Sequence, residues 1–134
     1  MSNASMWSPI SGPGSEATVI EVFSAWLAEQ GWECKQLPSH GDHPAVDARH
    51  VDGRRLIVEA KGFSRDSGSD LDTGYGKLLR RITDEPGTVY ALAVAKTVVR
   101  FAQRVPSGVR DKLGIALYTV DASGKVDHVD GPSL

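Results

Sequence analysis

The segment from Val46 to Gly62 reads VDARHVDGRRLIVEAKG and carries the clearest structural signal in the chain. At its centre lies Asp52-Gly53, a dipeptide typical of a tight turn between antiparallel strands. Apolar side chains alternate or cluster on both sides of this turn, as they do in strands. The segment therefore predicts a β-hairpin with strands over residues 45–50 and 55–61.

The charged end of the second strand needs a physical explanation. Its apolar residues run straight into Glu59, Ala60 and Lys61. Charged groups inside an apolar strand cost stability unless something pairs with them. Glu59 and Lys61 form either an ordinary ion pair at a solvated strand end, which contributes less than about 1 kcal/mol, or part of a functional site.

The pleat of the hairpin places a second carboxylate near these two groups. Residues two apart on a strand share a face, so Glu59 and Lys61 point the same way. Matching the apolar faces of the two strands puts Asp47 on that side as well. A loop with an odd number of residues, such as 52–54, or a bulge would set Asp47 directly opposite Glu59. A two-residue loop would instead set it opposite Val58.

Two carboxylates and an ammonium on one patch indicate a metal site. Neighbouring carboxylates repel each other, and a divalent cation relieves the repulsion. Oxygen ligands of this kind suit Mg²⁺, or Mn²⁺, with water and phosphate as further ligands. Such a metal activates water and stabilises charge on phosphorus, and an adjacent lysine orients or deprotonates that water.

In this arrangement the chain resembles the PD-(D/E)XK nuclease superfamily: Asp47, eleven intervening residues, then Glu59-Ala60-Lys61. The resemblance implies a restriction-endonuclease-like fold, an α/β three-layer sandwich with a mixed central sheet. It implies hydrolysis of phosphodiester bonds in nucleic acid, DNA in particular, with Asp47, Glu59 and the Ala60 carbonyl on Mg²⁺ and Lys61 as the catalytic lysine. The chain departs from the family pattern at the residue before Asp47, which is Val46, while Pro44 lies three positions before it.

Members of this superfamily often add a glutamate from their first helix. The sequence offers Glu16 and Glu21 in a helix that we expect to begin after Ser15 and to end at Gly31. At 100° per residue, Glu16 falls on the apolar stripe of this helix and Glu21 falls nearly opposite. We therefore expect Glu16 to support the site, although an acid in the first helical turn is also favoured by the helix dipole alone.

Relatives also carry a polar residue on the helix that follows the motif. The segment 74–81, GYGKLLRR, resembles that helix, with Lys77 where a glutamine is commoner. The resemblance marks four side chains as candidate nucleic-acid contacts: Tyr75, Lys77, Arg80 and Arg81. His40 and His43 lie in a loop before the hairpin, and we interpret them as solvated residues and not as zinc ligands.

The remaining elements follow from periodicity and turn residues. We expect a first strand over 32–37 and a mobile loop over the Gly- and Ser-rich segment 62–76. The predicted helices are 77–85, 97–105 and 107–113, with a strand as the alternative over 97–105 because of its β-branched residues. The predicted later strands are 88–96, 115–120 and 125–129.

The composition limits the class of protein. With 134 residues the chain is expected to hold one domain, over 15–134, after an expression scar (MSNA) and a disordered N-terminus over 1–14. A single cysteine, Cys34, favours a reducing cytoplasm, and no apolar run is long enough to span a membrane. The net charge is −2, but residues 74–113 hold eight basic and three acidic side chains, so that part of the chain could face a polyanion.

Two other functions are compatible with the same residues. The domain could be a non-catalytic nucleic-acid- or protein-binding module whose hairpin carboxylates are paired with Lys61 or Arg49. It could also be a partner protein for another enzyme, since the rest of the chain is acidic. Under the nuclease hypothesis, the small size of the chain suggests that a homodimer or a partner supplies specificity.

Overall fold

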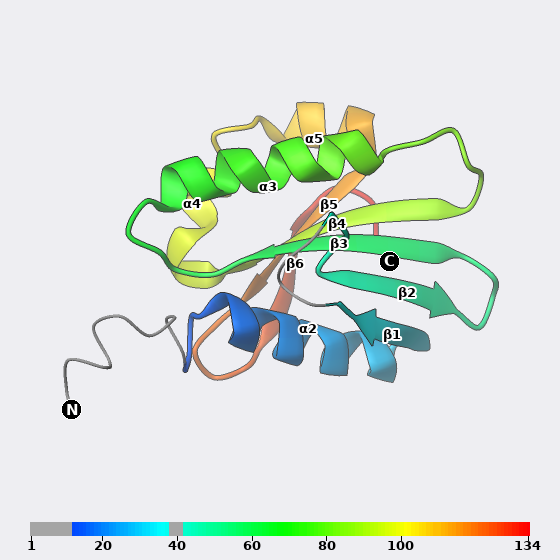
Figure 1. The fold of residues 1–134 in the computed structure, drawn as a ribbon, viewed down its shortest axis with the longest axis horizontal. Helices are drawn as coiled ribbons and strands as arrows, with labels where there is room; N and C mark the ends of the chain where they lie inside the picture. The colour runs from blue at the N-terminus through cyan, green and yellow to red at the C-terminus, as the bar shows by residue number, and fades with distance from the viewer. Residues whose placement is uncertain (1–11, 38–41) are drawn as a thin grey trace.

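The computed structural model describes residues 12–37 and 42–134, which form a three-layer α/β sandwich (Figure 1). The central sheet has six strands in the order β1-β2-β3-β4-β5-β6. Pairing is antiparallel from β1 to β3, parallel from β3 to β5 and antiparallel again for β6. The strands are β1 (Trp32–Gln36), β2 (Val46–His50), β3 (Arg55–Lys61), β4 (Thr88–Ala95), β5 (Ile115–Val120) and β6 (Val126–Asp130).

The predicted α/β class with a mixed sheet is confirmed. The helices are α2 (Glu16–Glu29), α3 (Ser67–Arg81), the 3₁₀ turn η1 (Lys96–Val98), α4 (Val99–Ala102) and α5 (Ser107–Leu113). The predicted expression scar and the rest of residues 1–11 lie outside the described residues.

Helix α2 covers one face of the sheet, and α3, α4 and α5 lie on the other (Figure 1). Ser15 begins α2 as predicted, because its side chain accepts a hydrogen bond from the Thr18 amide at 3.1 Å. The buried stripe of α2, with Val19, Phe23 and Leu27, packs against the sheet. Gly31 then adopts a φ of 93°, which ends the helix and lets the chain turn into β1.

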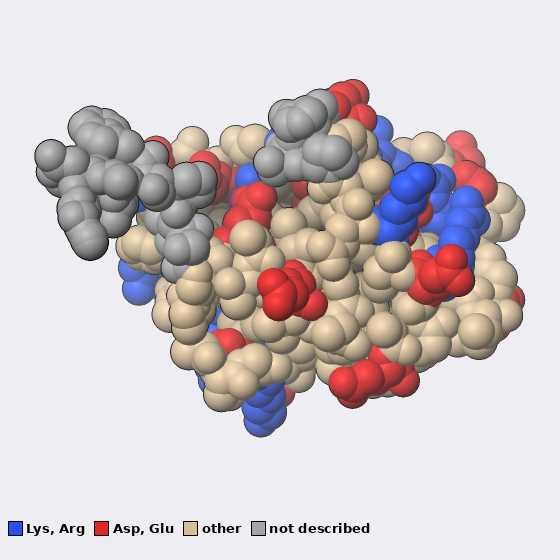
Figure 2. Space-filling model, turned by 60° about the horizontal axis from the view of Figure 1, so that its bottom comes forward, with Lys and Arg blue, Asp and Glu red and all other residues tan. Residues whose placement is uncertain are grey.

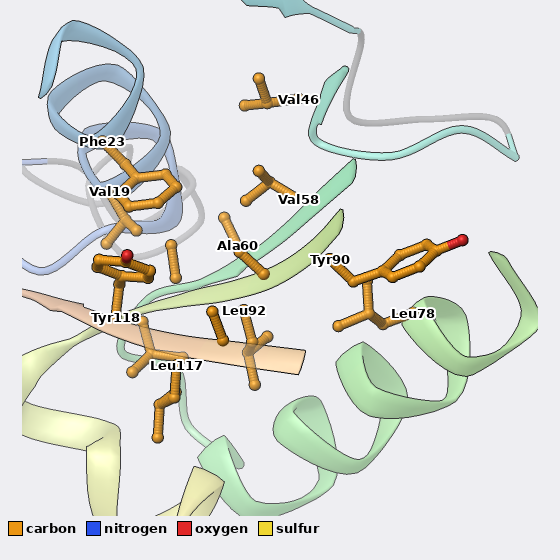
Figure 3. Close-up of a cluster of buried hydrophobic side chains, with 14 of the residues drawn as sticks. Val19, Phe23, Val46, Val58, Ala60, Leu78, Tyr90, Leu92, Leu117 and Tyr118 are labelled. Carbon is orange, nitrogen blue, oxygen red and sulfur yellow. The ribbon is translucent and has the colours of Figure 1, made fainter. Parts of the chain in front are cut away.

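The hydrophobic core lies on both sides of β3, β4 and β5. Figure 3 shows Phe23 and Tyr118 on the α2 side, and Leu78 of α3 packed near Tyr90 on the other side. All six residues of β5 are buried, as expected for a strand that helices cover on both faces. This doubly covered centre fixes β3, and therefore its charged end, in one orientation.

Helix α3 begins where the sequence predicted a mobile loop. It spans Ser67–Arg81, so the prediction of a loop is wrong over 67–76, and the predicted helix over 77–85 begins ten residues earlier and ends at Arg81. Asp66 accepts a hydrogen bond from the Ser69 amide and so begins the helix, which buries an apolar stripe on the sheet. The stripe consists of Leu71, Tyr75 and Leu78, and its helical period is hard to see in the sequence because Gly and Ser residues surround it.

A buried guanidinium ties α4 and α5 to the end of the chain. Arg110 of α5 is 1% exposed and forms an ion pair with Asp130 of β6 at 2.5 Å. Its other donors reach the carbonyls of Ala102, at 3.2 Å, and Val105. The helix predicted over 97–105 is therefore shorter in the structure, where η1 and α4 end at Ala102 and the carbonyls of Ala102 and Val105 accept hydrogen bonds from Arg110.

Candidate functional site

The register of the hairpin differs from the predicted one by two residues. His50 and Arg54 are joined by a backbone hydrogen bond, which leaves residues 51–53 as the loop. The loop has an odd number of residues, as predicted, but Asp47 lies opposite Ile57 and not opposite Glu59. The shift arises because the Asp52 side chain accepts a hydrogen bond from the Arg54 amide and centres the turn on Asp52.

The predicted faces of the hairpin are correct. Val46 lies opposite Val58 on the apolar face toward α2, and Asp47 shares the other face with Glu59 and Lys61. Since Asp47 is opposite Ile57, its diagonal neighbours on β3 are Arg55 on one side and Glu59 on the other. Diagonal neighbours lie roughly 7–8 Å apart, within reach of long side chains.

Glu59 is the most deeply buried carboxylate of the hairpin. Its side chain is 6% exposed, and Arg81 of α3 donates to it from Nε at 3.0 Å. Burial raises the pKa of Glu59 above its usual value, and the Arg81 guanidinium opposes this effect. A carboxylate in this position requires a cationic partner, which Arg81 supplies.

Asp47 pairs with a different guanidinium. Arg55 donates to its two carboxylate oxygens at 3.0 and 2.7 Å, in a bidentate arrangement. These hydrogen bonds lower the pKa of Asp47, with burial acting in the opposite direction. Each of the two carboxylates thus has its own arginine, Asp47 with Arg55 and Glu59 with Arg81.

Lys61 and Glu16 meet at the carboxyl end of β3. The Lys61 ammonium lies 3.6 Å from the Glu16 carboxylate, and the two side chains are 13% and 44% exposed. The chain can cross α2 here because Gly62 has no side chain, since a Cβ would lie 2.2 Å from the Glu16 amide nitrogen. Gly74 of α3 leaves room for the Lys61 side chain in the same way.

A small polar hollow joins these groups. It is lined by Glu59, Ala60 and Lys61 of β3, by Glu16 of α2 and by Lys77 of α3, together with His43. Its volume of about 40 Å³ has room for a few water molecules. Asp47 does not line it. The hollow therefore collects four of the predicted site residues, together with Lys77, one of the predicted nucleic-acid contacts.

The predicted nucleic-acid contacts separate into two groups. Lys77 lines the hollow, and Arg80 is exposed beside Arg81 on α3. Tyr75 is 7% exposed, and its hydroxyl donates to the Ala102 carbonyl at 2.6 Å. The prediction for Tyr75 is therefore wrong, because this side chain belongs to the core.

Two residues at this site were not identified from the sequence. Arg55 was not singled out, although its position two residues before Ile57 would have marked it as a diagonal neighbour of Asp47 in the correct register. His43 was interpreted as a solvated loop residue, yet it lines the hollow. Its position just before Pro44, at the entry to β2, was the available signal. His40 lies outside the described residues.

The described residues offer few ligands to a divalent cation. Within residues 12–37 and 42–134, no group of three or more His, Cys, Asp or Glu side chains is placed to hold a metal ion. Mg²⁺, however, is commonly bound through one or two carboxylates, waters and a substrate phosphate. Glu59, with Asp47 at its diagonal and water-sized space beside it, matches that smaller requirement.

Among the solved structures that resemble this chain are two from cyanobacterial proteins. One is an XisH family protein from Nostoc punctiforme PCC 73102, with a TM-score of 0.57 and 20% identity over 84% of this chain and 99% of that one. The other is an fdxN element excision controlling factor protein from Anabaena variabilis, with a TM-score of 0.51 and 18% identity over 85% of this chain and 99% of that one. No protein-family model and no curated protein matches the sequence. The likeness shows the fold, which is the restriction-endonuclease-like sandwich that the sequence predicted.

The charges on the α2 side of the molecule are dispersed. Figure 2 shows acidic side chains scattered over this face, with basic side chains gathered toward the side on which the β2–β3 turn lies in Figure 1. The described part of this face therefore forms no continuous basic surface. Among the described helices, none is long and apolar enough to cross a membrane.

Proposed function

We propose that the domain hydrolyses phosphodiester bonds in nucleic acid, with a divalent cation, Mg²⁺ or Mn²⁺, bound at the carboxyl end of β3. One observation carries this proposal. Glu59 and Lys61 share a polar hollow with Glu16 from α2 and Lys77 from α3. A carboxylate, two ammonium groups and a supporting acid, drawn from three elements, are a suitable set for a metal and a phosphate.

The proposed roles follow from the positions of the side chains. Glu59 and the Ala60 carbonyl hold the cation, and Asp47 joins them by turning from Arg55 toward its other diagonal neighbour. When bound, the metal lowers the pKa of a water and stabilises charge on the phosphate. Lys61 orients or deprotonates the attacking water, and Glu16 holds the Lys61 ammonium in place.

Three considerations support nucleic acid as the substrate. Lys77 and Arg80 lie on α3 next to the hollow and can contact phosphates. The segment around them is the basic part of the chain. One structural neighbour is named for the control of element excision, a name that suggests work on nucleic acid; this last support is an analogy of fold. We propose DNA as the substrate, with a second copy of the chain or a partner supplying specificity.

The test combines metal binding with cleavage. We expect Mn²⁺ binding by calorimetry and metal-dependent cleavage of plasmid or oligonucleotide, both lost in Glu59→Gln. Lys61→Ala should abolish cleavage and retain the fold. Glu21→Gln is the matched control, because Glu21 is an exposed acid on the same helix as Glu16 but away from the hollow. Cleavage that persists in both Glu59→Gln and Lys61→Ala would rule the proposal out.

A second candidate function has its own observation. Glu16, Asp47 and Glu59 each have a basic partner within 3.6 Å. A fully paired set is what a non-catalytic binding module would also contain. Thermal unfolding separates the two functions, since a ligand of the folded state raises the melting temperature. A melting temperature that Mn²⁺ leaves unchanged, with and without an oligonucleotide, would favour the binding module.

A further inference from the structure

Arg81 occupies the carboxylate to which the proposed metal must bind. Its Nε lies 3.0 Å from Glu59 Oε2, and its side chain is 17% exposed. A second carboxylate, that of Asp42, lies 3.5 Å from its Nη2 at the surface. Arg81 belongs to the last turn of α3, so a well-packed helix holds its backbone in place. The guanidinium is therefore the resident cation of Glu59 in this structure.

A metal ion and this guanidinium cannot share Glu59 without conflict. Both are positive, and the carboxylate between them is almost fully removed from water, where like charges repel strongly. Binding of a divalent cation at Glu59 must therefore weaken or break the Arg81 ion pair. The metal affinity of the free protein is reduced by the free energy of that pair, in the manner of any competing ligand.

A groove beside Glu59 offers the released guanidinium a new partner. Its volume is about 260 Å³, and its described lining includes Arg55, Arg80 and Arg81 together with the acidic Glu85. It meets the polar hollow at Pro44, which lines both. Three guanidinium groups around one groove suit a phosphate, to which arginine can donate two hydrogen bonds.

We propose that Arg81 is an exchange latch: it neutralises Glu59 in the metal-free protein and turns to a phosphate of the nucleic acid when the metal takes Glu59. The inference rests on the proposed function and adds a regulatory step to it. The metal and the nucleic acid then bind with positive cooperativity, because each favours the position of Arg81 in which it is released from Glu59. By linkage the two effects are equal, so the metal strengthens nucleic-acid binding by the same factor as the nucleic acid strengthens metal binding.

Removal of Arg81 tests the exchange, with its neighbour Arg80 as the control. The variants are Arg81→Gln and Arg80→Gln, each in a Lys61→Ala background so that the oligonucleotide stays intact. Mn²⁺ affinity is measured by calorimetry, and oligonucleotide affinity by fluorescence anisotropy over a range of salt concentrations, with and without Mn²⁺. The titrations are run at mildly alkaline pH, because loss of Arg81 raises the pKa of the buried Glu59 and protons would otherwise compete with the metal.

The two variants should differ in kind. Without oligonucleotide, Arg81→Gln should bind Mn²⁺ at least about fivefold more tightly than the parent, the lower end of ordinary coupling between sites. Its affinity for the oligonucleotide should no longer increase when Mn²⁺ is added. In the presence of Mn²⁺, the slope of log affinity against log salt concentration should be smaller by about 1 than in the parent. Arg80→Gln should bind Mn²⁺ as tightly as the parent does. Its slope of log oligonucleotide affinity against log salt concentration should be smaller by about 1, both with and without Mn²⁺.

A measurement on the unaltered protein covers the case in which Arg81→Gln fails to fold. The Nε–H resonance of Arg81 is followed by nuclear magnetic resonance during a titration with Mg²⁺. It should shift as Glu59 releases the guanidinium, while the resonance of Arg110, which is paired with Asp130 in the core, should stay in place. An Arg81 resonance that does not move while the metal binds at Glu59 would overturn the latch.

The outcomes separate the latch from the proposed function. If the parent binds Mn²⁺ through Glu59 but Arg81→Gln binds it no more tightly, the latch is wrong and the metal site stands. If neither the parent nor Arg81→Gln binds Mn²⁺, with or without oligonucleotide, both the latch and the proposed function are wrong. Tighter metal binding in Arg81→Gln together with a lost metal effect on the oligonucleotide supports both.

Discussion

Two carboxylates on the same face of one hairpin each pair with a guanidinium, and the two ion pairs differ in burial. Asp47 and Arg55 belong to adjacent strands, and their side chains are 25% and 30% exposed. Glu59 belongs to β3 and Arg81 to the last turn of α3, and their side chains are 6% and 17% exposed. The first pair lies toward the turn, and the second lines the hollow or the groove beside it.

The two pairs also shift the acid pKa in opposite directions. Arg55 lowers the pKa of Asp47 because its hydrogen bonds outweigh the effect of partial burial. Burial raises the pKa of Glu59 because it outweighs the effect of Arg81. The Asp47–Arg55 pair therefore stabilises the fold. The Glu59–Arg81 pair instead neutralises a buried carboxylate with a raised pKa, as is often found at functional sites.

The largest expected effect comes from Glu59→Gln. This change removes a proposed metal ligand, so we expect metal-dependent cleavage to fall by at least about 100-fold, or about 2.7 kcal/mol in the barrier. Initial rates on a labelled oligonucleotide measure it, with circular dichroism as the check on folding. A rate within tenfold of the unaltered protein would remove the functional distinction between the two pairs.

The same variant makes a prediction about stability. The folded-state pKa of Glu59 lies above its unfolded value, so the native state holds this proton more tightly, and Glu59 contributes less stability as pH rises through that pKa. Glu59→Gln should therefore show a weaker loss of stability with rising pH. Urea unfolding at several pH values, in the absence of metal, measures this slope.

Asp47→Asn should have an intermediate effect, a loss of folding stability. The contribution of Asp47 to stability should depend on pH in the opposite direction to that of Glu59. Its lowered pKa means that the pair with Arg55 stabilises the fold above the usual value of 3.8 and loses this contribution as pH falls through the folded-state pKa. We expect a loss of about 1 kcal/mol near neutral pH and a smaller loss on acidification than in the unaltered protein. Equal acid sensitivity of the two proteins would contradict the assignment.

Metal binding in Asp47→Asn sharpens the comparison further. If Asp47 turns from Arg55 toward Glu59 when the metal binds, this variant should bind Mn²⁺ more weakly than the unaltered protein. Arg55→Gln is the matched control, because it frees Asp47 without removing a carboxylate, and it should bind Mn²⁺ at least as tightly. If Asp47→Asn binds Mn²⁺ as tightly as the unaltered protein, Asp47 is not a metal ligand and has a structural role only.

Glu16→Gln should have the smallest effect. Its carboxylate is 44% exposed and lies 3.6 Å from Lys61, so the pair contributes under about 1 kcal/mol. We expect stability within about 0.5 kcal/mol of the unaltered protein and cleavage reduced at most about fivefold. A much larger loss of cleavage would show that Glu16 is itself a ligand of the metal.

Local sequence patterns were sufficient to predict the hairpin, its two faces and the first helix. A turn at Asp52-Gly53 and a two-residue period are local signals, and they place Asp47, Glu59 and Lys61 on one side without any knowledge of the rest of the chain. The helical wheel of α2 likewise selected Glu16, which the structure brings to Lys61. These features follow from backbone geometry, which acts over a few residues.

Which charged side chains pair with each other depends on how the elements pack in the folded chain. The register differs by two residues because the Asp52 side chain recentred the turn, and this made Arg55 the partner of Asp47. The start of α3 and the burial of Tyr75 depend on packing against the sheet, which outweighs the low helix propensity of a segment rich in Gly and Ser. Arg81 reaches Glu59 across 22 residues of sequence, and no local pattern encodes a contact between a strand and a helix that pack together only in the folded chain.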